Sequence, residues 1–327
     1  FEPAFPFGTN ANGQDIFTRL AAGARFSFLL AIVSVALVQS GQKWCLLPAA
    51  GCLVFSLSIY QSYISLAAGL LVVLLIREVL LGTDAGAVLK KGIFYVLFLV
   101  GCLLAYYLGT QEVFLLTGTE MGAYASGNFT FTPSAILGGA VLAYQNFFRF
   151  FSEGFCGLIP TAFSRVLHTA VLAAAFLLLV MLTLKKKLHM TESLLLAVLV
   201  VLLPLAINCM YMITSEGSIH TLVLYSFVSI YILAAMLVDQ LLANTELHKL
   251  PELLRRLAVD GSALAMALII FINIYTSLID NFSHRIVVGG EHGNFLTSIL
   301  HLFEPKCCYG SYFAFYRHFV QSFNILY

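Results

Sequence analysis

Charged side chains are scarce in this chain. They make up 10% of its 327 residues, whereas 60% are hydrophobic; soluble domains carry about 25% charged residues. The mean hydropathy of +0.93 indicates too little polar surface to cover a water-facing globule. The composition therefore excludes an ordinary soluble enzyme and predicts a polytopic membrane protein.

Other absences narrow the functional classes. The 17 basic residues barely exceed the 16 acidic ones, so there is no positive field for nucleic acid. The motifs typical of serine hydrolases, zinc peptidases, P-loop enzymes and dinucleotide-binding enzymes do not occur. The cysteines and histidines lack metal-ligand spacing, and we therefore expect neither a metal nor a cofactor.

Long uncharged runs are present instead. A membrane-spanning helix needs about 20 apolar residues. Such runs occur at 26–42, 44–76, 92–111, 166–184, 193–215, 217–238 and 262–279. The 44–76 run is too long for one span, and its most polar stretch is 58–63. We predict that it forms two short helices, 44–58 and 62–76, joined by a tight hairpin, which gives an all-α bundle of eight spans.

Lysine and arginine are concentrated on one side of the predicted bundle. Most of them lie in the loops at 43, 77–91, 185–191 and 239–261. Because cytoplasmic loops carry an excess of basic residues, we expect these loops in the cytoplasm and both termini outside. The chain then divides into an outward segment, a transmembrane bundle and a second outward segment, at 1–25, 26–279 and 280–327.

The longest outward segment inside the bundle covers residues 112–165. Four phenylalanines flank Arg149 in it, and glycines and a proline follow. A helix with aromatic residues and few charges suits the bilayer surface. We predict an interfacial helix over 134–151 and a loop over 112–133.

Acidic and basic residues near the outward ends of the spans are candidates for chemistry. A membrane glycosyltransferase needs a carboxylate as general base and cations to hold the phosphate of a lipid carrier. The carboxylates are Glu112, Glu120, Glu153, Glu216 and Asp280, and the cations are Arg149, Arg165 and Arg285. The alternative interpretation is that these groups are solvated loop charges and headgroup contacts.

Two short polar motifs interrupt apolar sequence. Tyr60 and Gln61 lie in the predicted hairpin, where polar residues at membrane depth are often functional; alternatively, they only satisfy the bent backbone. Glu216 and His220 lie four residues apart in a short outward turn. This turn is either part of a site or an interfacial turn with a histidine.

Three stretches occur in the order and spacing of a known family. They are a helix, Tyr-Gln turn and helix at 57–76, a span with a polar loop at 103–129, and a proline-containing span, turn and span at 201–233. Over residues 46–280 the chain resembles the bacterial type II glucosyl transferases that modify O-antigen.

The resemblance implies a fold similar to glycosyltransferase type C and an active face outside the bacterial plasma (inner) membrane. It also implies a polyprenyl-phosphate sugar donor, with glucose as the expected sugar, and a surface glycan acceptor. Glu120, Glu216 and His220 are the implied catalytic residues. Tyr60 and Gln61 are the implied substrate-binding residues, and the three arginines above are expected to hold the phosphate.

Two features of the N-terminal region keep alternatives open. Enzymes of this architecture usually carry a catalytic Asp after an N-terminal span that this sequence does not show. Two explanations follow. Either the chain is truncated upstream, a case that includes an inactive transferase, or the general base is one of the carboxylates named above. Residues 5–38 separately resemble oligopeptide-type ABC importer permeases, but the spans at 166–184 and 193–215 lack the charge that a polar transport path would need.

Overall fold

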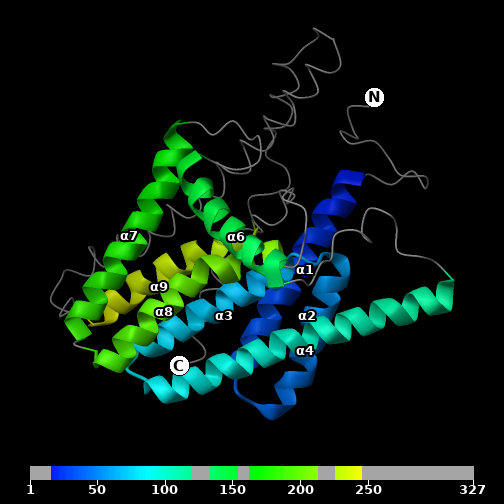
Figure 1. Cartoon of the computed structure of the whole chain (residues 1–327), viewed down its shortest axis with the longest axis horizontal. Coiled ribbons are helices and arrows are strands. Elements are labelled where there is room, and N and C mark those ends of the chain that lie inside the picture. The colour runs from blue at the N-terminus through cyan, green and yellow to red at the C-terminus, as the bar shows by residue number, and fades with distance from the viewer. Residues whose placement is uncertain (1–15, 119–132, 154–161, 187, 213–224, 245–327) are drawn as a thin grey trace, which may run out of the picture. The chain divides into compact units, whose positions relative to one another are not determined.

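The structure is a computed structural model that describes residues 16–118, 133–153, 162–186, 188–212 and 225–244. All of these residues belong to one compact unit, Phe1–Asn273; a second unit, Ile274–Tyr327, lies outside the described residues. The described elements are all helical, without a strand among them (Figure 1). They are α1 (Ile16–Gln39), η1 (Lys43–Cys45), α2 (Leu46–Ile59), α3 (Tyr63–Leu80), α4 (Ala85–Thr117), α6 (Pro133–Glu153), α7 (Ala162–Lys186), α8 (Met190–Ile207), η2 (Cys209–Met212) and α9 (Val228–Asn244).

Apolar helices account for most of the predicted spans. In the described part of the chain, α3, α4, Arg165–Lys186 of α7, and α8 are long and apolar enough to cross a bilayer. Shorter apolar helices cover Phe26–Gln39, Lys43–Ile59 and Tyr225–Leu241. The prediction of an all-α membrane protein is therefore confirmed. The predicted span at 262–279 lies outside the described residues, and the total of eight stays a prediction.

The break in the long apolar run is present. Helix α2 ends at Ile59, Tyr60 has extended backbone with φ −156° and ψ 118°, and α3 begins at Tyr63. The amide of Ile64 donates to the carbonyl of Gln61 at 3.2 Å, which closes the first turn of α3. The predicted break is thus confirmed: α2 ends and α3 begins each one residue beyond the expected bound.

Helices α1 and α2 are joined by small residues and buried serine hydrogen bonds. Ser34 Oγ donates to the carbonyl of Ala49 at 2.7 Å, and Ser56 Oγ donates to the carbonyl of Ser27 at 2.8 Å. Because lipid tails are as apolar as leucine, close packing and interhelical hydrogen bonds, rather than the hydrophobic effect, hold such a pair together.

Helix α3 is the central helix of the described unit. It packs against α1, α2, α4, α7, α8 and α9 (Figure 1). A Cβ added at Gly69 would lie 2.7 Å from Ser229 Oγ and 3.0 Å from Ile207 Cγ1, so the helices α8 and α9 approach α3 closely where it has no side chain.

Basic residues gather where α3 ends. Lys91 Nζ lies 2.6 Å from the Glu78 carboxylate, and Lys186 Nζ donates to the carbonyl of Leu80. A cation at a helix C-terminus satisfies free carbonyls and interacts favourably with the helix dipole. The predicted basic loops at 77–91 and 185–191 thus meet at one end of the unit, called here the basic end. The hairpin lies at the other end of α3, called the hairpin end.

Helix α4 corrects the prediction that residues 112–133 form a loop. It continues to Thr117, because the first left-handed residue is Gly118, with φ +62°. At its start, the Asp84 carboxylate accepts from the amides of Gly86 and Ala87 at 2.9 and 3.2 Å. Most of the predicted loop 77–91 is consequently helical as well.

Two further expectations need correction. Helix α6 covers the predicted interfacial helix 134–151, but Phe147, Phe150 and Phe151 are buried in protein and only Phe148 is exposed. The predicted span 193–215 is shorter than expected, since α8 ends at Ile207 and η2 follows.

Candidate functional site

The structure describes half of the eight residues that were assigned a catalytic or substrate-binding role. Tyr60, Gln61, Arg149 and Arg165 are described. The remaining candidates, Glu120, Glu216, His220 and Arg285, lie outside the described residues. Two groups of side chains around the described candidates form distinct sites.

The first group surrounds the hairpin. Gln61 Nε2 donates to the hydroxyl of Tyr106 at 2.7 Å, which connects the hairpin to α4. Polar side chains at membrane depth need partners, and the pair supplies one to each residue. Sequence reasoning selected Gln61 but missed Tyr106, which lies in the predicted span 92–111.

Aromatic rings extend this group to α1 and to Tyr225, just before α9. The rings of Tyr63 and Tyr225 stack with centroids 6.2 Å apart and planes at 22°. The Phe28 ring packs edge-on against both, at 6.5 Å from Tyr63 and 6.2 Å from Tyr225. Tyr63 is 2% exposed, whereas Tyr225 is 41% exposed. Tyr60, Gln61, Tyr63, Tyr106 and Tyr225 together are called the hairpin site.

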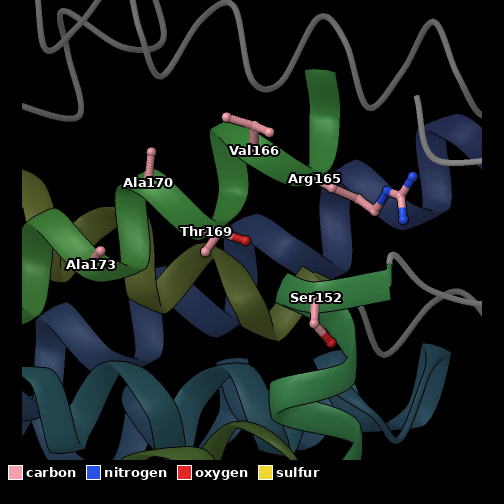
Figure 2. A pocket seen from close by; sticks show the side chains of 6 residues that line it. All are labelled: Ser152, Arg165, Val166, Thr169, Ala170 and Ala173. Atoms are coloured by element: carbon pink, nitrogen blue, oxygen red, sulfur yellow. The ribbon is translucent and has the colours of Figure 1, made fainter. Parts of the chain in front are cut away.

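The second group is an open hollow of about 580 Å³ between α6 and α7. It is lined by Ser152, Arg165, Val166, Thr169, Ala170 and Ala173 (Figure 2). Thr169 Oγ1 donates to the carbonyl of Phe151 at 2.8 Å, which fixes α7 against the end of α6. One cation, two hydroxyls and an apolar wall therefore share one surface, called the arginine hollow.

The arginine hollow lies toward the hairpin end of α7. Lys186 contacts the end of α3 at the basic end, and Arg165 precedes it by about 30 Å of helix at 1.5 Å per residue. Arg149 is exposed on α6 and does not line the hollow. Of the two described arginines predicted to hold a phosphate, the structure thus places one in a cavity.

Buried aromatic side chains join the two groups. The Phe150 ring stacks on Phe227 with centroids 4.1 Å apart and lies 5.3 Å from the His168 ring. His168 Nδ1 is hydrogen-bonded to the hydroxyl of Tyr231. Phe227 follows Tyr225 by two residues. Sequence reasoning missed the His168–Tyr231 pair, for which the only signal was a histidine in an apolar run.

Cys209 is a packed thiol of the same region. Its Sγ lies 3.2 Å from Ser65 Oγ, and burial raises the pKa of the thiol to about 11. The thiol therefore stays protonated at neutral pH and is a poor nucleophile. Within the described ranges, no group of three or more His, Cys, Asp or Glu side chains could hold a metal ion.

The helices, their apolar surfaces and the two sites define a multi-helix membrane protein that carries two polar sites. A comparison with family models matches residues 17–233 to the family described as Glucosyl transferase GtrII. The match runs from α1 into α9 and covers more than half of the chain, so the chain belongs to the Glucosyl transferase GtrII family. This confirms the family resemblance read from the sequence.

The other comparisons found no match. Neither the search of curated proteins nor the search of solved structures returned a similar protein. The importer alternative has no support, since the family match begins inside the 5–38 segment that suggested it.

Proposed function

We propose that this membrane glucosyl transferase moves glucose from a polyprenyl-phosphate carrier to a cell-surface glycan such as O-antigen. The reaction would take place at the outer face of the bacterial plasma membrane. The family match supports sugar transfer. What we propose beyond sugar transfer is the identity of the carrier, the identity of the acceptor and the role of each residue.

The arginine hollow is the observation that carries this proposal. A polyprenyl phosphate has an anionic head and an apolar tail. Arg165, with the hydroxyl of Ser152, offers donors for the head. Val166, Ala170 and Ala173 line an apolar wall beside them. Charge-assisted hydrogen bonds are the strong contacts of a phosphate, while the tail needs only an apolar surface at the level of the bilayer.

The chemistry is a single group transfer. A hydroxyl of the acceptor attacks the anomeric carbon of the sugar, and the bond between that carbon and the phosphate oxygen breaks. The electron pair leaves with the phosphate, whose growing charge Arg165 would stabilise. The hydroxyl proton passes to Glu120 or Glu216, and His220 orients the acceptor or assists the proton transfer.

The connections of the chain support these assignments. The segment 213–224, which carries Glu216 and His220, joins Met212 to Tyr225. Its two flanks contact the hairpin end: Cys209 pairs with Ser65, and Tyr225 stacks on Tyr63. The described residues on both sides of this segment therefore lie near the hairpin.

Replacement of Arg165 tests the proposal. Transfer from polyprenyl-phosphate glucose to lipopolysaccharide is measured in membranes that contain the full chain, Arg165→Gln or Arg165→Lys. Hydrogen bonds to charged groups contribute about 1.5–3 kcal/mol, so Arg165→Gln should lower kcat/KM for the donor about 10- to 150-fold. Arg165→Lys keeps the charge and should lose less.

The matched control is Lys185→Gln, which removes an exposed cation at the basic end and should transfer at the unsubstituted rate. Equal rates for Arg165→Gln and Lys185→Gln would exclude Arg165 as the phosphate ligand. No transfer by the unsubstituted chain, at confirmed expression, would refute the proposed reaction.

A further inference from the structure

The Gln61–Tyr106 pair retains hydrogen-bonding capacity. The bond from Gln61 Nε2 to the Tyr106 hydroxyl is the only side-chain hydrogen bond that either residue makes within the described residues. The Gln61 amide therefore keeps its carbonyl oxygen as acceptor and a second N–H as donor, and Tyr106 keeps its hydroxyl hydrogen. Both side chains are partly exposed, so these groups are accessible to a ligand.

The Tyr225 ring supplies an apolar surface at the same end. One face of the ring stacks on Tyr63, and the side chain remains 41% exposed. Tyr63 also packs against Tyr60, with centroids 6.2 Å apart, and Tyr60 precedes Gln61 in the chain. The exposed Tyr225 ring is therefore connected to the Gln61–Tyr106 pair through Tyr63 and Tyr60.

The lack of charged side chains in the hairpin site indicates which kind of ligand it can bind. None of the five side chains of the hairpin site is charged at neutral pH, and a desolvated phosphate requires charge-assisted donors. The anionic head of the lipid carrier therefore suits the arginine hollow and not the hairpin site. A neutral sugar ring has the complementary surface: hydroxyls around its rim for an amide and a phenol, and a C–H face for an aromatic ring.

We infer that Gln61, Tyr106 and Tyr225 bind a neutral hexose unit of the acceptor glycan. The inference deepens the proposed function and rests on it for the identity of the acceptor. It assigns Tyr106 and Tyr225, which sequence reasoning did not select. It also separates the two substrates: the donor phosphate binds between α6 and α7, and the acceptor sugar binds at the hairpin, α4 and Tyr225.

A binding experiment tests the inference without the reaction. The detergent-solubilised full chain, fluorescently labelled, is applied to an array of bacterial surface oligosaccharides. The unsubstituted chain should bind at least one of them. Tyr106→Phe should weaken that binding about fivefold, the value of one net hydrogen bond. Tyr225→Ala should weaken it, whereas Tyr225→Phe keeps the ring and should retain binding.

Tyr107→Phe is the matched control. Tyr107 is the next residue of α4, is 56% exposed and points about 100° away from Tyr106 around the helix. Binding to no glycan by the unsubstituted chain, or unchanged binding by both Tyr106→Phe and Tyr225→Ala, would overturn the inference.

A kinetic measurement distinguishes the inference from the proposed function. In the transfer assay, Tyr106→Phe should raise KM for the acceptor and leave KM for polyprenyl-phosphate glucose unchanged. A chain that binds glycans through Tyr106 and Tyr225 but transfers no sugar would refute the proposed reaction and keep the saccharide site. A rise in KM for the donor alone would overturn the inference and keep the reaction.

Discussion

Two neighbouring glycines of α6 should respond to the same substitution in opposite directions. A Cβ at Gly139 would clash with the carbonyl oxygen of Tyr211 and lie 2.8 Å from the Cα of Met212. A Cβ at Gly138 would meet nothing within 4 Å. The backbone of η2 lies against Gly139, and a backbone cannot move aside as the tip of a side chain can.

The magnitudes decide the sign at each position. Alanine is favoured over glycine in a helix interior by about 1 kcal/mol, and Gly138→Ala should gain up to that amount. Overpacking typically costs about 1–3 kcal/mol, and a clash with backbone lies at or above the upper end. Gly139→Ala should therefore destabilise the protein by about 2 kcal/mol after the helix gain is subtracted.

The consequence should extend to function. Element η2 connects α8 to the segment 213–224, and Asn208 Nδ2 donates to the carbonyl of Ala143 on α6 at 3.1 Å. A displaced α6 would shift that connection and the proposed catalytic residues beyond it. Gly139→Ala should lower kcat for transfer as well as stability.

Thermal denaturation in detergent, followed by circular dichroism, measures the stability of both variants, and the transfer assay measures kcat. Gly138→Ala is the control for the effect of alanine on α6. If Gly139→Ala unfolds at or above the temperature of Gly138→Ala, the close approach of α6 and η2 is wrong.

Three further predictions concern topology, the interface and the buried pair. A cysteine that replaces Lys185 should not react with impermeant thiol reagents applied to intact cells, since basic loops face the cytoplasm. Labelling from outside would show that the predicted orientation is inverted. The single tryptophan, Trp44, is 91% exposed beside Lys43, and its fluorescence should be quenched most by lipids brominated near the headgroup, where tryptophan is enriched. Strongest quenching at the bilayer centre would contradict this position. Tyr231→Phe and His168→Phe should each lower the free energy of unfolding by about 1–3 kcal/mol. The double variant should lower it by less than the sum of the two single effects. Additive effects would show that the two side chains are not coupled.

The candidate site was only partly predictable. Gln61 could be selected because a glutamine within a long apolar run is conspicuous. Tyr225 could not, because its role depends on stacking against Tyr63, which is 162 residues earlier in the chain. Arg165 could be named as a cation, but its place in a hollow depends on how α6 and α7 meet. Such pairings follow from the rotation of each helix about its axis.

The phenylalanines of α6 show the same limit. Their abundance predicted an interfacial helix, yet Phe147 and Phe150 stack on Phe227 in the protein interior. An aromatic ring suits the bilayer surface and a protein core equally, and the sequence pattern does not distinguish them.

The sequence by itself determined the class of protein, the position of the hairpin and the gathering of basic residues at one end. Each depends on local properties: apolar content, the length of a run, and charge. Only the tertiary structure decided which helices face protein and which face lipid. Helices α3 and α4 have nearly equal mean hydropathy, 2.1 and 2.0, yet 78% of the apolar stretch of α3 is buried and 11% of that of α4. The physical reason is that a helix that is apolar on every side carries no amphipathic signal to show which side will be covered.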